Sequence, residues 1–187
     1  MNSRDDYMPG PADRADVRKE RDKWTLVLVR ELRHPPPTVW QAITDPASLR
    51  EWAPFDADRS LGAVGTVRLT TVGTLTPQTS ETRVTLAEEP RLLEYRWGGQ
   101  EIRWQLEPVG EGTRLTLWHS IDRGFISMGA AGWHICLDVF ERLLAGDPIG
   151  RIVGGDAMKF GWPRLNTEYA KRFGIELPDW PAKESKT

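Results

Sequence analysis

Five consecutive segments between residues 66 and 120 alternate apolar and polar side chains with a period of two. They are residues 66–72, 82–89, 91–97, 101–108 and 113–120. Such alternation is typical of antiparallel strands that turn one face to water and the other to a core. Gly98-Gly99 separates two of these segments, which is the pattern of a two-residue hairpin. The sequence therefore predicts an antiparallel meander with one buried face.

Helical periodicity flanks this meander on both sides. Residues 23–32 read as a first strand, and Pro35–Pro37 and Asp45 then favour the starts of two short helices. Two apolar stripes follow the meander, one formed by Trp133, Leu137, Phe140 and Leu144 and the other by Leu165, Tyr169 and Phe173. Gly146 and Gly174 are expected to end these two helices. This order predicts an α+β protein whose helices cover one face of the sheet.

The two ends of the chain differ in composition from the middle. Residues 1–22 are charged and carry few apolar side chains, so we expect a flexible arm, with some helix toward its end. Residues 176–187 read as a tail, in which Trp180 could dock onto the body. A single domain is expected over residues 23–175.

Composition excludes several functional classes. The formal net charge of −2 gives no basic surface for nucleic acid. No apolar run approaches the ~20 residues of a membrane span, and the N-terminus lacks the apolar core of a secretory signal. A single cysteine allows no internal disulfide. We therefore expect a cytoplasmic protein without a nucleic-acid partner and without a membrane span.

Three stretches in this order resemble the START-like (SRPBCC, helix-grip) superfamily. They are HPPPTVWQAITDPASLREW, VGEGTRLTLWHS and GWHICLDVFERLLAGDP, and the last is similar to the branch of activator of heat-shock-protein-90 ATPase homologues. The resemblance covers residues 24–174. It implies a helix-grip fold, in which a curved antiparallel sheet with two short helices after its first strand grips a long helix on its concave face. An extra C-terminal helix is expected, and the resemblance implies an apolar cavity between the sheet and the long helix.

Strand alternation assigns the concave face without the resemblance. In 113–120, Leu117 and His119 lie opposite Arg114, and because arginine belongs in water, the histidine points inward. The same reasoning turns Arg68, Arg96 and Arg103 outward. The residues expected to line the cavity are Trp52, Leu69, Tyr95, Trp97, Trp104, Leu117, His119, Trp133, His134 and Leu137.

Two interpretations of this aromatic set remain open. The chain has nine tryptophans, and they can pack into a solid core or line a pocket. The polar tips of Tyr95, Trp97, Trp104 and His119 need partners when buried, which a ligand or waters could supply.

The segment that joins Trp133, His134 and Cys136 raises the question of a metal or nucleophile. His134 and Cys136 diverge by about 200° on a helix, so they cannot chelate one ion, and we expect no metal site. Cys136 lies among apolar residues and is expected to be an inert buried thiol. His134 could face His119 across the cavity mouth, or it could be a structural or surface histidine.

Three functions fit this sequence. The first is binding of a hydrophobic molecule, aromatic or lipid-like, with no cofactor. The second is a chaperone-associated or self-associating protein that acts through its surface, where the outward Trp118 marks a contact or packs on the N-terminal arm. The third is cyclase- or hydrolase-type catalysis by His119, His134 and Tyr95. The sequence assigns no catalytic residue.

Overall fold

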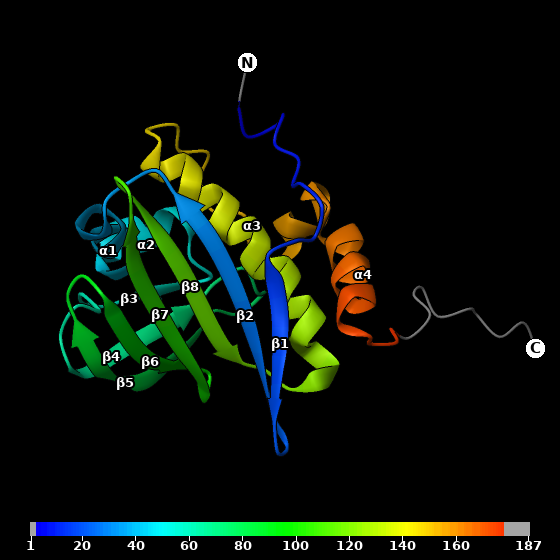
Figure 1. The fold of residues 1–187 in the computed structure, drawn as a ribbon, viewed down its shortest axis with the longest axis horizontal. Coiled ribbons are helices and arrows are strands. Elements are labelled where there is room, and N and C mark those ends of the chain that lie inside the picture. Colours follow the sequence, from blue (N-terminus) through cyan, green and yellow to red (C-terminus); the bar gives the residue numbers. More distant parts are fainter. Residues whose placement is uncertain (1–2, 178–187) are drawn as a thin grey trace, which may run out of the picture.

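The computed structural model describes residues 3–177, which form a curled antiparallel sheet of eight strands with helices on one side (Figure 1). The strands are β1 (Ala15–Glu20), β2 (Lys23–Leu32), β3 (Phe55–Ala57), β4 (Gly65–Thr71), β5 (Gln78–Glu88), β6 (Leu92–Trp97), β7 (Gln100–Val109) and β8 (Gly112–Ser120). They lie in the order β1-β2-β8-β7-β6-β5-β4-β3. The first and last long strands of the chain, β2 and β8, are therefore neighbours, and β3 to β8 form the predicted meander.

Most of the helices lie behind the sheet in the view of Figure 1, and the last one lies beside the edge strand β1. They are α1 (Pro36–Thr44), α2 (Pro46–Trp52), α3 (Ile126–Leu144) and α4 (Trp162–Phe173), with the 3-10 turns η1 (Arg123–Phe125) and η2 (Gly154–Phe160). The long helix α3 packs on β2, α2 and α4. This arrangement is the predicted α+β helix-grip fold, including the additional C-terminal helix. Within residues 3–177, no helix combines the length and the apolar character needed to cross a membrane.

Local sequence signals account for the turns between these elements. Asp45 ends α1 and caps α2, because its carboxylate accepts a hydrogen bond of 3.0 Å from the backbone nitrogen of Ser48. Gly98 and Gly99 have φ angles of 58° and 79° and join β6 to β7. Positive φ at both central residues is what a tight hairpin requires. Both predicted turns are confirmed.

The two faces of the sheet carry the side chains that alternation assigned to them. Leu69, Tyr95, Trp104, Leu117 and His119 are all buried. Arg68, Arg96, Arg103 and Arg114 are all exposed. The predicted register is confirmed, since a slip of one residue would have exchanged the two sets.

The N-terminal arm differs from its prediction. Residues 15–20 form β1, an edge strand that pairs antiparallel with β2, and Tyr7 is buried against the helices. The expectation of a flexible arm over residues 1–22 is therefore wrong for these residues, and no helix forms there. Low apolar content did not reveal this, because an edge strand gains its order from backbone hydrogen bonds to a neighbouring strand. The predicted tail lies outside the described residues apart from Glu176 and Leu177, and the suggestion that Trp180 docks also falls outside them.

Candidate functional site

The concave face carries a cluster of buried aromatic side chains whose rings contact one another. The rings of Trp52 and Trp104 are 6.0 Å apart, and those of Trp104 and Trp133 are 5.5 Å apart, both edge to face. Phe140 of α3 lies 4.7 Å from Trp52. Such contacts stabilise a core beyond the area that they bury. These contacts favour the solid-core interpretation for this part of the face.

The polar tips in this cluster find their partners inside the protein. The indole of Trp104 donates to the Tyr95 hydroxyl at 3.0 Å, and that of Trp97 donates to the Thr71 hydroxyl at 2.8 Å. Burial raises the pKa of Tyr95, so its hydroxyl stays protonated. These groups therefore need neither a ligand nor water as a hydrogen-bond partner. The sequence alone had left that possibility open.

His119 is a neutral imidazole with both nitrogen atoms occupied. The indole nitrogen of Trp133 donates to its Nδ1 at 2.9 Å, and its Nε2 lies 2.9 Å from the Oε1 of Gln100. Since an indole can only donate, Nδ1 is the acceptor and the proton belongs on Nε2. Burial lowers the pKa of His119 to about 4. This histidine therefore orients Trp133 rather than exchanging protons near neutral pH.

We expect His119 to make folding stability depend on pH. The unfolded chain protonates this histidine near pH 6.5 and the folded protein near pH 4. The unfolded state binds more protons between these values, so the free energy of unfolding should decrease as the pH falls, by up to about 3 kcal/mol in total. Urea denaturation at several pH values between 7 and 4 measures this decrease.

The matched variant for this test is His119→Asn, which keeps a hydrogen-bond acceptor near the position of Nδ1. It should be less stable at pH 7 and should lose most of the slope. His134, whose pKa burial also lowers, contributes to the remaining slope with the same sign. Equal slopes in the parent and the variant would contradict the assignment.

His134 lies in a different environment from His119. Its Nδ1 is 2.7 Å from the hydroxyl of Tyr169 on α4, and its Nε2 is 3.5 Å from the carboxylate of Asp138. Consecutive helical residues point about 100° apart, so Trp133 faces the sheet while His134 faces α4. Of the two interpretations that the sequence left open for His134, a hydrogen-bonded structural histidine fits this placement, and the side chain does not face His119. A catalytic pair of cavity histidines is not formed.

Cys136 lies on the same helix, α3, and is buried. Its side chain is almost completely shielded, and burial raises the pKa of its thiol to about 12. A thiol of this kind carries almost no thiolate near neutral pH, which agrees with an inert cysteine. Among residues 3–177, no group of three or more His, Cys, Asp and Glu side chains is placed to hold a metal ion.

A cavity of about 320 Å³ lies beside this aromatic core rather than within it. Three of the predicted residues line it, namely Trp97, His119 and Trp133. Six others fill the core instead: Trp52, Leu69, Tyr95, Trp104, Leu117 and Leu137. His134 belongs to the cluster with Tyr169. The cavity therefore opens at one end of the gripped helix, where β6 and β8 end.

Sequence reasoning missed the other wall of this cavity. Gly129 and Gly132 of α3, residues 152–158 and Trp162 of α4 supply most of it. The helical stripe that we recognised began only at Trp133, one residue after the second glycine. Two glycines three positions apart in a helix were the available signal, because they leave one face of the helix without side chains.

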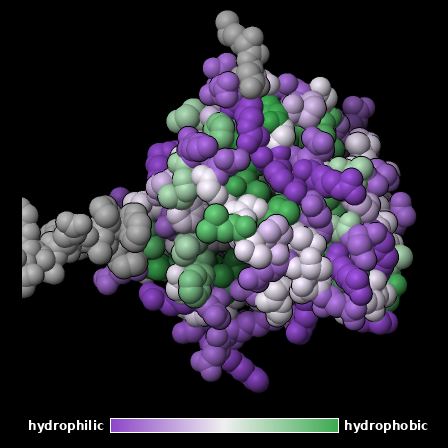
Figure 2. Space-filling view, turned by 180° about the vertical axis from the view of Figure 1, so that it is seen from behind, coloured by the Kyte–Doolittle hydropathy of each residue, from purple (hydrophilic) through white to green (hydrophobic). Residues whose placement is uncertain are grey.

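The mouth of the cavity is apolar. Met128 and Met158 line it and are 41% and 50% exposed. Figure 2 shows the helical side of the molecule, where hydrophobic side chains gather at the centre and hydrophilic ones surround them. Exposed methionine beside a hollow is typical of adaptable binding surfaces.

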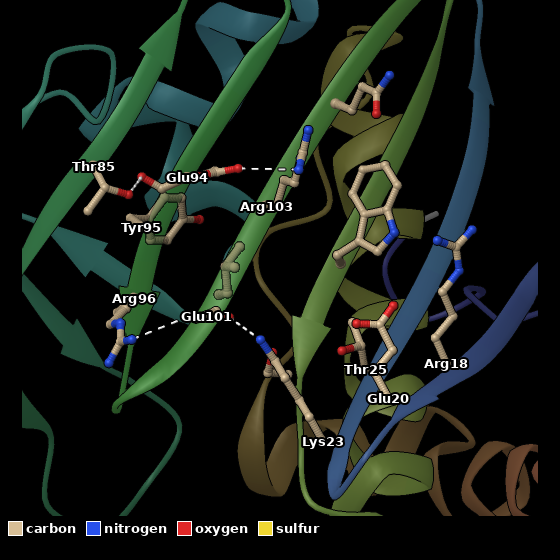
Figure 3. A pocket seen from close by; sticks show the side chains of 14 residues that line it. Arg18, Glu20, Lys23, Thr25, Thr85, Glu94, Tyr95, Arg96, Glu101 and Arg103 are labelled. Carbon is tan, nitrogen blue, oxygen red and sulfur yellow. Dashed lines mark hydrogen bonds and ion pairs between the residues drawn. The ribbon is translucent and has the colours of Figure 1, made fainter.

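A larger hollow of about 570 Å³ lies on the outer face of the sheet and has a different character (Figure 3). Its charges neutralise one another in cross-strand ion pairs, in which Glu101 holds Lys23 and Arg96 and Glu94 holds Arg103. The pKa of the Glu101 carboxyl group is lowered, mainly because Lys23 donates a hydrogen bond to it. This hollow is a surface groove in which Lys23, Glu94, Arg96, Glu101 and Arg103 are paired with one another.

Trp118 lies in the same groove. It is half-buried, and the guanidinium of Arg103 lies 5.4 Å from its ring. Arg18 and Glu20 of β1 also line the groove, so Trp118 borders the N-terminal strand.

The fold and its hollow can now be compared with known proteins. The family described as "Polyketide cyclase / dehydrase and lipid transport" matches residues 23–165. The chain belongs to this family. The predicted START-like superfamily, to which the family belongs, is thereby confirmed. A comparison with curated proteins found no significant match.

Solved structures of this START-like type share the fold. The conserved protein of unknown function EF2215 from Enterococcus faecalis is 19% identical, with a TM-score of 0.64 over 84% of this chain and 89% of its own. CalU16 from Micromonospora echinospora is 21% identical, with a TM-score of 0.63 over 88% and 93% of the two chains. The AHSA1-like protein from Aeromonas hydrophila is 18% identical, with a TM-score of 0.52 over 65% and 92%. At these identities the likeness shows the fold alone, so it does not favour the chaperone-associated function over the others.

Proposed function

We propose that this START-like domain binds a small hydrophobic molecule in the cavity between α3, residues 149–162 and the end of the sheet. The observation that carries this proposal is an apolar hollow of about 320 Å³ that opens to the surface between Met128 and Met158. Volumes of about 300–1,000 Å³ with apolar walls are typical of ligand pockets. Membership of a family described by polyketide and lipid chemistry agrees with this use.

Gly132 supports the proposal because it leaves space where a side chain could stand. A Cβ atom added there would find only the indole nitrogen of Trp162, 4.0 Å away. Glycine inside a helix costs about 1 kcal/mol of helix stability relative to alanine. The surrounding side chains do not require a glycine at this position, because a Cβ atom would fit there. A ligand in the cavity would need the space that the glycine leaves.

The walls indicate the class of ligand. Trp97, Trp133 and Trp162 present ring surfaces, and the two methionines present flexible thioethers. His119 is neutral, and its nitrogen atoms are already bonded to Trp133 and Gln100. The inner end therefore offers no charge, which favours an aromatic or lipid-like molecule over an anion.

Filling the cavity tests this function. The uncharged probe N-phenyl-1-naphthylamine should bind the parent and quench its tryptophan fluorescence, since three tryptophans line the cavity. Gly132→Leu places a side chain in the hollow and should weaken probe binding by at least about tenfold, while removal of a helical glycine keeps the fold stable. Fluorescence titration measures the affinity, and thermal unfolding checks the fold.

The matched control is Gly124→Leu, which adds the same side chain in η1, where a Cβ atom meets nothing within 4 Å. This variant should bind the probe like the parent. Equal affinity of the probe for the parent and Gly132→Leu would place its binding outside the cavity and overturn the proposal. A native mass spectrum of the freshly purified protein identifies any ligand that it already carries.

A further inference from the structure

One wall of the cavity is a segment without regular helices other than η2, which we name the lid (residues 149–161). It contributes Ile152, Val153, Gly154, Ala157 and Met158 to the cavity. Gly150 and Gly161, near its two ends, have φ angles of 78° and 84°. Glycines at such angles can change conformation at little steric cost, so the lid has a point of articulation near each end.

The lid is fixed to the body at one place by its own side chain. Arg151 donates to the backbone oxygen of Leu49 at 2.9 Å and to the carboxylate of Asp56 at 2.7 Å. These contacts lie on the side of α2 and β3. They hold the beginning of the lid and leave residues 152–161 to other contacts.

Apolar packing holds the middle of the lid, where Ile152 and Ala157 are buried. The polar contacts at its two ends come from the N-terminal segment, and Arg4 provides most of them. Nη1 of Arg4 lies 3.0, 2.9 and 3.0 Å from the backbone oxygens of Ile149, Gly150 and Arg151. Its guanidinium also lies 3.6 Å from the Asp156 carboxylate and 5.5 Å from the centre of the Phe160 ring. One side chain thus joins both ends of the lid.

The residues after Arg4 attach this segment to the helices. Tyr7 is buried, packs on Phe160 with ring centres 5.9 Å apart, and donates its hydroxyl to the Asp138 carboxylate at 2.5 Å. Arg164 of α4 donates to the backbone oxygen of Pro9 at 2.6 Å. The segment from Arg4 to Gly10, which we name the strap, therefore crosses the lid and is anchored on α3 and α4.

We infer that the strap holds the lid closed and that its release opens the cavity. The three carbonyl oxygens at residues 149–151 are satisfied by Arg4, and hydrogen bonds to a charged donor are stronger than those between neutral groups. Connecting segments open locally at a lower free energy than the strands and helices of the core. The strap controls access to the cavity whether or not a ligand is present, and only its effect on ligand exchange rests on the proposed function.

Cys136 reports the opening without any ligand. It lines the cavity, is 3% exposed and is the only cysteine of the chain. Its reaction with 5,5′-dithiobis(2-nitrobenzoic acid) under native conditions should be slow in the parent. Arg4→Ala should accelerate this reaction by about tenfold or more, because the closed lid loses several charged hydrogen bonds. Arg114→Ala, which removes an exposed arginine paired with Glu31 on the sheet, should leave the rate unchanged.

Global unfolding is separated from lid opening by urea denaturation of the same variants. Arg4→Ala should accelerate labelling by a larger factor than the change in its global unfolding equilibrium. Tyr7→Phe, which keeps the ring and loses the hydrogen bond to Asp138, should show a smaller acceleration. The proposed role of the strap would be contradicted by an unchanged labelling rate in Arg4→Ala. It would also be contradicted if labelling accelerated only by the factor by which the global unfolding equilibrium changes.

Ligand exchange distinguishes the strap from the proposed function. Stopped-flow mixing with N-phenyl-1-naphthylamine should show faster association and dissociation in Arg4→Ala than in the parent. Absence of probe binding in both proteins would contradict the proposed function. The labelling rates of Cys136 would still show whether the strap holds the lid closed. Identical probe kinetics together with unchanged labelling would contradict the strap alone.

Discussion

Trp104→Ala should lower the free energy of unfolding by about 3–5 kcal/mol, the cost of a large truncation in a packed core. Trp104 is fully buried, contacts Trp52 and Trp133 edge to face, and donates to Tyr95. The variant would lose these contacts and leave the Tyr95 hydroxyl without its donor. Urea denaturation followed by circular dichroism measures the change.

A comparison with a second tryptophan, on α4, sharpens this test. Trp162 is only partly buried and borders the cavity, so Trp162→Ala should cost distinctly less stability than Trp104→Ala. The sequence had placed Trp104 on the floor of a pocket, which would have made its removal inexpensive. A loss below about 1 kcal/mol for Trp104→Ala would restore that earlier interpretation and contradict the solid core.

Arg30→Ala should lower the free energy of unfolding by a comparable amount, about 3–5 kcal/mol. The substitution breaks a largely buried ion pair and leaves the charge of the partner behind without its arginine. Arg30 lies on the concave side of β2, and its Nη1 is 2.7 Å from Asp138 on α3 and 3.3 Å from Glu141. Asp138 also accepts the Tyr7 hydroxyl. The variant therefore uncouples β2, α3 and the N-terminal segment at one point.

Two further variants show whether the remaining charge causes this loss. Arg30→Met combined with Asp138→Asn removes both charges at similar volume and should recover a large part of the stability. Arg114→Ala breaks an exposed pair on the neighbouring strand, and we expect little change. A loss for Arg30→Ala no larger than that for Arg114→Ala would contradict a structural role for the Arg30–Asp138 pair.

Much of the fold could be predicted because its signals are local. The period of two in 113–120 placed Leu117 and His119 inside and Arg114 outside, and the structure confirms each position. Asp45 and Gly98-Gly99 likewise set a helix cap and a hairpin through their own backbone preferences. The resemblance of three motifs in the right order then supplied the helix-grip topology.

The candidate site could be predicted only in part. Periodicity tells which face a residue occupies, and so it found Trp97, His119 and Trp133. It does not tell whether facing side chains meet or leave a gap, and Trp104 therefore appeared as a pocket wall when it is core. Periodicity also could not predict the environment of Asp138. The pattern assigns this residue to the polar side of α3, but in the structure it forms an ion pair with Arg30 and accepts a hydrogen bond from Tyr7.

The sequence by itself determined the strands, their faces and the gripped helix, since these depend on contacts between residues close along the chain. Only the tertiary structure decided which distant segments meet. It brought β1 to the sheet edge, turned His134 toward Tyr169 and laid Arg4 across Ile149, about 145 residues away. The cavity arises from these long-range contacts, because a hollow is the space that remains when segments far apart in sequence have packed together.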